Sequence, residues 1–120
     1  MARVGLEIEF FASAEQLEAT GLVNGAAKDC AVFEEIAAVL SVTAAAGTAP
    51  TLNVHFEVSN DGAIWTDLGV AFTETAIVSS EYKAITVPFG KWVRAAATVG
   101  SGAADGVFTF SVAGRGKVSL

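Results

Sequence analysis

Residues 52–62 read LNVHFEVSNDG, and this stretch decides the fold class. Its first eight residues alternate between apolar and polar side chains, which is the pattern of a strand with one buried face. The Ser59-Asn60-Asp61-Gly62 segment that follows predicts a hairpin turn, because glycine readily adopts the positive φ that such turns require. The sequence therefore predicts a strand, a tight turn and a return strand that starts near Ala63.

The return strand carries apolar residues up to Phe72, and its Asp67 and Gly69 predict a bulge or a bend. At the N-terminus, apolar residues alternate with Gly5, Glu7 and Glu9, which predicts a half-buried first strand. Residues 13–20 predict a short helical turn or a loop. Further strands are expected at about 28–33, 36–46, 82–87, 92–99 and 107–113, with 82–87 paired to 92–99. Helix competes for 36–46, where Ala and Leu favour it, but the central Val-Leu-Ser-Val-Thr favours a strand.

These segments add up to about eight or nine short strands separated by turn residues. That spacing predicts an all-β fold, an antiparallel β-sandwich that is jelly-roll-like, in a single domain of residues 1–120. Parallel βαβ units are excluded because the chain leaves no room for crossover helices.

The apolar side chains are mostly small. Apolar residues make up 52% of the chain, but 23 of its 120 residues are Ala and 12 are Gly, so we expect a thin core or burial shared with a partner. This predicts a homo-oligomer, a trimer first and a dimer second. Residues 1–27 are expected to form an extended or exchanged N-terminal arm. Its candidate assembly strand contains Val4, Leu6, Ile8 and Phe10.

The charge balance excludes several partners. A net charge of −6 with only seven Lys and Arg argues against nucleic-acid binding. The uncharged run 36–56 is interrupted by Gly47, Pro50 and Asn53, so we expect no membrane span. One Cys and one His cannot build a zinc site of the usual kind, and we expect no metal and no cofactor.

No catalytic residues are predicted, and the chain is not expected to be an enzyme. Cys30 is expected to be a buried small side chain whose neighbour Asp29 raises its pKa. His55 is expected on the polar face of its strand, solvated or hydrogen-bonded. Glu7 and Glu9 share a strand face that we interpret as solvated, and Gly100 to Gly106 is interpreted as a loop. The Ser59–Gly62 run lacks the calcium-loop spacing and is interpreted as a turn.

Exposed aromatic side chains leave a different function open. Trp65, Tyr82 and Trp92 are candidate platforms for stacking on sugar rings, although such residues more often pack in the core or at the rim of the sandwich. A carbohydrate-binding module is therefore the alternative hypothesis.

The chain from about Gly47 to Lys117 resembles small all-β virion proteins of tailed bacteriophages, and capsid decoration (cement) proteins most of all. The resemblance lies in three segments: Gly47-Thr48-Ala49-Pro50 leading into the hairpin with Trp65, the Phe89-Gly90-Lys91-Trp92-Val93-Arg94-Ala95 run, and the closing Phe108-Thr109-Phe110-Ser111-Val112. It implies a structural protein that binds the major capsid protein on the virion surface after synthesis in the host cytoplasm. A tail-associated structural protein is the second possibility within this resemblance.

Overall fold

Two antiparallel sheets form the molecule. The structure is a computed structural model that describes residues 3–18, 21–103 and 105–119, and these residues contain strands and no helix. The four-stranded sheet has the order β1 (Arg3–Glu18), β9 (Val107–Ser119), β4 (Glu35–Ala46), β7 (Ser79–Ile85). In the second sheet, β2 (Leu22–Asn24) and β3 (Lys28–Asp29) both pair with β8 (Trp92–Gly100), which is followed by β5 (Thr51–Ser59) and β6 (Thr66–Ala71).

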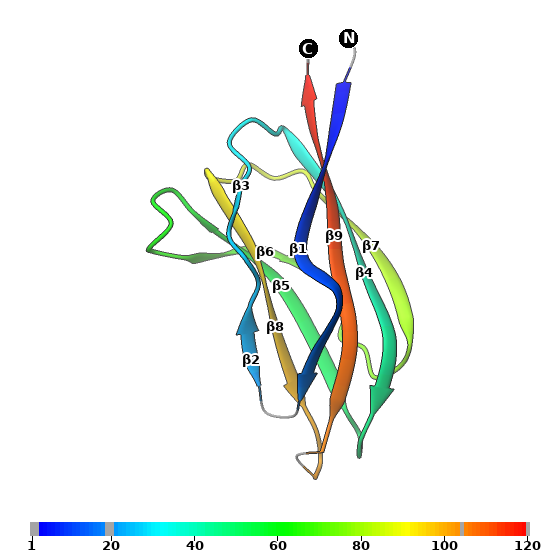
Figure 1. The fold of residues 1–120 in the computed structure, drawn as a ribbon. Helices are drawn as coiled ribbons and strands as arrows, with labels where there is room; N and C mark the ends of the chain where they lie inside the picture. The colour runs from blue at the N-terminus through cyan, green and yellow to red at the C-terminus, as the bar shows by residue number, and fades with distance from the viewer. Residues whose placement is uncertain (1–2, 19–20, 104, 120) are drawn as a thin grey trace.

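This strand order is that of a jelly roll. Successive strands alternate between the sheets, except where β2 and β3 share one strand position beside β8 and where β5 and β6 form a hairpin (Figure 1). The sheets face each other in an elongated molecule of 50 × 29 × 20 Å. The predicted antiparallel, jelly-roll-like sandwich is confirmed.

The core lies between the sheets and consists of the inward side chains of the long strands. Phe10 of β1 and Phe56 of β5 meet edge to face, with ring centroids 5.2 Å apart. The largest fully buried side chains are Phe10, Phe56, Phe108, Phe110, Ile36, Leu40, Leu52 and Ile85. The core is therefore not thin, because a few large rings supply the volume that the many alanines lack.

Two glycines of β9 make room for aromatic rings. A Cβ at Gly114 would lie 2.9 Å from Cε2 of Phe10, and a Cβ at Gly116 would lie 2.5 Å from Cγ of Phe33. Both glycines are at buried positions, where any side chain would compete with these rings. The glycines therefore act as the small partners of these two rings.

Several predicted elements are confirmed. The segment predicted at 36–46 is strand β4, and the one predicted at 107–113 lies within β9. The bulge predicted on the return strand is present: the β5–β6 register shifts between His55 and Glu57, and Gly69 has a φ of 83°.

Four local predictions were wrong. Residues 13–18 are not a helical turn or a loop but the second half of β1, paired with β9. Only Lys28 and Asp29 of the predicted 28–33 strand are extended. The return strand begins at Thr66 rather than near Ala63. The expected pairing of 82–87 with 92–99 does not occur, since β7 pairs with β4 and β8 pairs with β5.

Candidate functional site

The outer edge of β1 is an open edge of the four-stranded sheet. β1 stands at the end of its sheet, and on its other side none of the described residues forms a strand paired with it. From Arg3 to Glu9 its register with β9 is regular, and register shifts begin only after Glu9. Open edges present unpaired N–H and C=O groups that can accept a further strand. This edge is therefore the best-formed surface for binding another chain.

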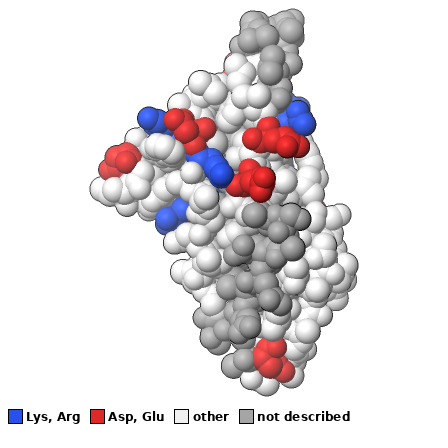
Figure 2. Space-filling model, viewed as in Figure 1, with Lys and Arg blue, Asp and Glu red and all other residues white. Residues whose placement is uncertain are grey.

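A hollow of about 620 Å³ runs beside this edge. Glu7, Glu9, Phe10 and Phe11 of β1 line one side of it, and residues 23–26 with Lys28 line the other. Acidic and basic side chains lie together in a band that crosses this face over β3 and the N-terminal half of β1 (Figure 2). The interpretation of Glu7 and Glu9 as exposed on one strand face is confirmed. They form the acidic wall of the hollow.

The two sheets touch at one end of this hollow. A Cβ at Gly25 would collide with the carbonyl oxygen of Phe10 and lie 3.2 Å from that of Ala95, while the Gly25 N–H donates to the Ala95 carbonyl at 2.7 Å. Only a glycine lets the 24–26 backbone come this close to β1. The accessible part of the β1 edge therefore ends before Phe10.

The predicted assembly residues divide between the core and the surface. Ile8 and Phe10 are buried in the core, whereas Leu6 is 49% exposed. The side chain of Val4 lies outside the described residues. A partner could therefore touch Leu6 and the β1 backbone, but not Ile8 or Phe10.

A polar cluster lies on the outer face of the second sheet. Glu57 of β5 accepts hydrogen bonds at Oε1 from Arg94 Nε of β8, at 2.7 Å, and at Oε2 pairs with His55 Nε2, at 3.1 Å. Burial raises the pKa of Glu57, but the hydrogen bonds from Arg94 and His55 outweigh it and hold that pKa below its usual value. The predicted polar-face position of His55 is confirmed. The sequence did not predict the role of Arg94 in this cluster, because its partner Glu57 lies 37 positions away and the pair leaves no local pattern.

The three candidate aromatic platforms are not brought together. The Arg94 guanidinium lies 4.2 Å from the ring centre of Trp65, and Lys91 Nζ lies 5.2 Å from that of Trp92. Tyr82 is exposed on β7, in the other sheet. Each tryptophan is half-buried and has a cation over its ring, and Trp65 lies against Arg94 on the outer face of the second sheet.

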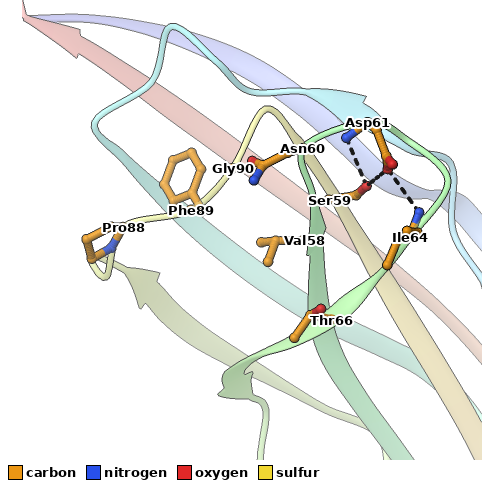
Figure 3. Close-up of a pocket in the computed structure, with 9 residues that line it drawn as sticks. All are labelled: Val58, Ser59, Asn60, Asp61, Ile64, Thr66, Pro88, Phe89 and Gly90. Carbon is orange, nitrogen blue, oxygen red and sulfur yellow. Dashed lines mark hydrogen bonds between the residues drawn. The ribbon is translucent and has the colours of Figure 1, made fainter.

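The hairpin tip borders a second hollow, of about 610 Å³, which Pro88, Phe89 and Gly90 also line (Figure 3). The Asp61 carboxylate accepts from the backbone N–H groups of Ile64 and Ala63 and from the Ser59 hydroxyl, and these bonds lower its pKa to about 2. All of these hydrogen bonds lie within the loop that carries Asp61, which confirms that the Ser59–Gly62 run is a turn.

At the opposite end of the sandwich, hydrogen bonds to a second aspartate carboxylate join two loops. Asp105 accepts hydrogen bonds from the Ser101 hydroxyl and from the N–H and hydroxyl of Thr48, and its pKa falls to about 2. These bonds tie the β8–β9 loop to the β4–β5 loop.

Cys30 is fully buried, as predicted. Burial, and to a lesser extent the charge of Asp29, raises the pKa of its thiol to about 12. Among the described residues, no three His, Cys, Asp or Glu side chains are grouped to hold a metal ion. The described segments also include no helix long and apolar enough to cross a bilayer.

Comparison with protein-family models and with curated proteins finds no match. Among solved structures, the chain is similar to a protein of Bacillus endospore appendages, described as a novel family of disulfide-linked pili, with a TM-score of 0.51 and 17% identity over 98% of this chain and 87% of that one. It is also similar to a chain of infectious bursal disease virus, Gx strain, with a TM-score of 0.60 and 7% identity over 97% of this chain and 32% of that one. At these identities the comparisons establish a shared fold.

Proposed function

We propose that this protein is a non-enzymatic structural component of a virus particle, a phage decoration (cement) protein that binds the major capsid protein and stabilises the head. The observation that carries this proposal is the jelly-roll sandwich with the open β1 edge. The two similar solved structures described above belong to a pilus and a virus, which supports an assembly role.

The edge would act by strand addition. Main-chain groups of β1 pair with an edge strand of another subunit, and the exposed Leu6 adds apolar contact. A protein that binds the assembled shell but not its dissociated subunits stabilises the shell by mass action. No chemical step is required for this function.

Co-sedimentation with intact phage heads tests the proposal. Wild-type protein is expected to pellet with the heads and to raise their resistance to heat and osmotic shock. Leu6→Glu should lose both effects, whereas Leu22→Glu, which changes another exposed leucine away from the β1 edge, should keep them.

A glycan array separates the two alternatives. Binding to a sugar that Trp65→Ala abolishes without unfolding the protein would replace the capsid proposal by a carbohydrate-binding module. Binding to purified tails but not to heads would instead place the protein at the tail.

A further inference from the structure

We infer that two copies of this chain pair through β1 around a two-fold axis at Leu6, which joins their four-stranded sheets into one sheet of eight strands. This inference deepens the proposed assembly function and rests on it for its biological role: in the free protein the β1 edge pairs with a second copy, and on the head a capsid subunit would take the place of that copy. Its partner is a second copy of the chain, and its contact is the stretch of β1 from Arg3 to Glu9.

We choose the stretch from Arg3 to Glu9 because it is the regular and accessible part of the β1 edge. Its register with β9 is regular from Arg3 to Glu9, and beyond it a bulge and the close approach of Gly25 to Phe10 obstruct the edge. Figure 1 shows that the N-terminal end of β1 and the C-terminal end of β9 run past the other strands. A strand added here therefore meets an extended and accessible backbone.

Symmetry then restricts the register. When two identical strands pair antiparallel around a two-fold axis, one residue lies opposite its own copy, and the numbers of opposed residues have a constant sum. Only the register centred on Leu6 pairs the whole free stretch with itself. It places Arg3 opposite Glu9, Val4 opposite Ile8 and Gly5 opposite Glu7.

The charges agree with this register. Each copy contributes one Arg3–Glu9 cross-strand pair, and Glu7 faces a glycine rather than another acid. The register centred on Glu7 would instead set Glu7 against its own copy, and the register centred on Gly5 would pair only residues 3–7. Opposite charges across a strand pair stabilise it and like charges destabilise it.

Leu6 supplies the apolar part of the contact. It is 49% exposed in the single chain, although it follows the same alternation as the buried Ile8. In the paired sheet, Leu6 would face Leu6 of the other copy on the core side, and each would cover the other.

The edge at the other side of the same sheet is less suited to pairing. β7 turns Glu81 and Lys83 towards the core side of the sheet, opposite Leu40 and Ala38 of β4. Inward-pointing charges on an edge strand oppose the addition of a further strand. The structure therefore favours β1 and a two-fold pair over the trimer expected from side-chain size.

Sedimentation velocity of the full chain, without capsids, tests the pair over protein concentrations from about 1 to about 500 µM, because a contact this small is expected to be weak. Wild type should shift from one to two chain masses of 12.2 kDa each. Glu9→Arg and Arg3→Glu should each weaken dimerisation about tenfold, and the double variant Arg3→Glu/Glu9→Arg should restore it. Glu74→Arg, with the same charge change away from β1, should leave it unchanged.

Oxidative cross-linking tests the register. Leu6→Cys should form a disulfide-linked dimer, because opposed Cα atoms in an antiparallel pair lie about 4.5–5.5 Å apart. Glu7→Cys is the control, since its two copies would lie about 8 Å apart, beyond disulfide reach. The native Cys30 is buried and should not contribute.

A wild-type protein that remains one chain mass at the highest concentration overturns the inference, as does a dimer that ignores the charge reversals. Preferential cross-linking of Glu7→Cys overturns the register. A monomer that still binds and stabilises heads would refute the pair and leave the proposed function standing. A dimer that binds neither heads nor tails would refute the function and leave the pair standing.

Discussion

The guanidinium of Arg94 lies on the indole of Trp65 and at the same time bonds to Glu57, so one side chain of β8 contacts β5 and the residue that precedes β6. Arg94 and Glu57 are directly opposed in the β5–β8 register, and each side chain is 20% exposed. The cluster therefore stiffens the outer face of the second sheet.

Removing the Arg94 side chain should be costly. Arg94→Ala loses a charge-assisted hydrogen bond and a cation–π contact, and we expect it to lower the free energy of unfolding by about 2 kcal/mol. Urea unfolding followed by tryptophan fluorescence measures the loss. Lys91→Ala, which removes the more exposed cation over Trp92, should change stability by less than about 0.5 kcal/mol. Equal losses in the two variants would contradict a special role for Arg94.

Glu57 should make stability depend on acid pH. Its folded pKa is below the unfolded value of about 4.3, so the ionised form stabilises the fold above that pH, and this contribution disappears as the pH falls through the folded pKa. Wild type should be more stable than Glu57→Gln at neutral pH, and the difference should shrink below about pH 4. Urea unfolding of both proteins across this range is the measurement. A difference independent of pH would show that Glu57 does not titrate as its contacts require.

The two loop aspartates should stay ionised in strong acid. Asp61 and Asp105 have pKa values of about 2, so the stability they add is complete above the unfolded Asp pKa and is lost as the pH falls through about 2. Carboxyl chemical shifts in an NMR titration report both values directly. Midpoints of Asp61 and Asp105 that coincide with a model peptide would mean that neither carboxylate holds its loop in solution.

Gly25 should not tolerate a side chain. Gly25→Ala places a Cβ against the Phe10 carbonyl, where backbone cannot move aside cheaply, and we expect a loss of about 1–3 kcal/mol. Gly102→Ala is the matched control, because its nearest neighbour would be the Thr48 carbonyl oxygen at 3.5 Å. Thermal unfolding followed by circular dichroism compares the two. A Gly25→Ala protein as stable as Gly102→Ala would show that the sheets do not need to meet so closely there.

Local alternation predicted the faces of the strands well, because burial of one face depends only on neighbouring residues. It did so for residues 52–59. Residues 36–46 were predicted as a strand from the Val-Leu-Ser-Val-Thr at their centre, against the competing helix propensity. The segment 13–18 shows the limit: its Glu, Gln and Leu favour a helix, but pairing with residues 107–110 of β9 overrides that preference. Which strands pair is decided by contacts far apart in sequence, so β7 and β8 were wrongly joined.

The same limit applies to the candidate site. The shared faces of His55 with Glu57 and of Glu7 with Glu9 follow from a spacing of two, and both were predictable. Arg94 joins Glu57 only through the β5–β8 register, and the edge position of β1 emerges only from the whole sheet order. Neither could be deduced from a single segment.

The fit of Phe10 against Gly114, and of Phe33 against Gly116, has an evolutionary consequence. A larger residue at either glycine can be accommodated only if the facing ring becomes smaller, so each pair should vary as a unit among diverged relatives. The phenylalanine–glycine pairs should therefore leave a covariation signal between segments about a hundred and about eighty positions apart, even where overall similarity has faded.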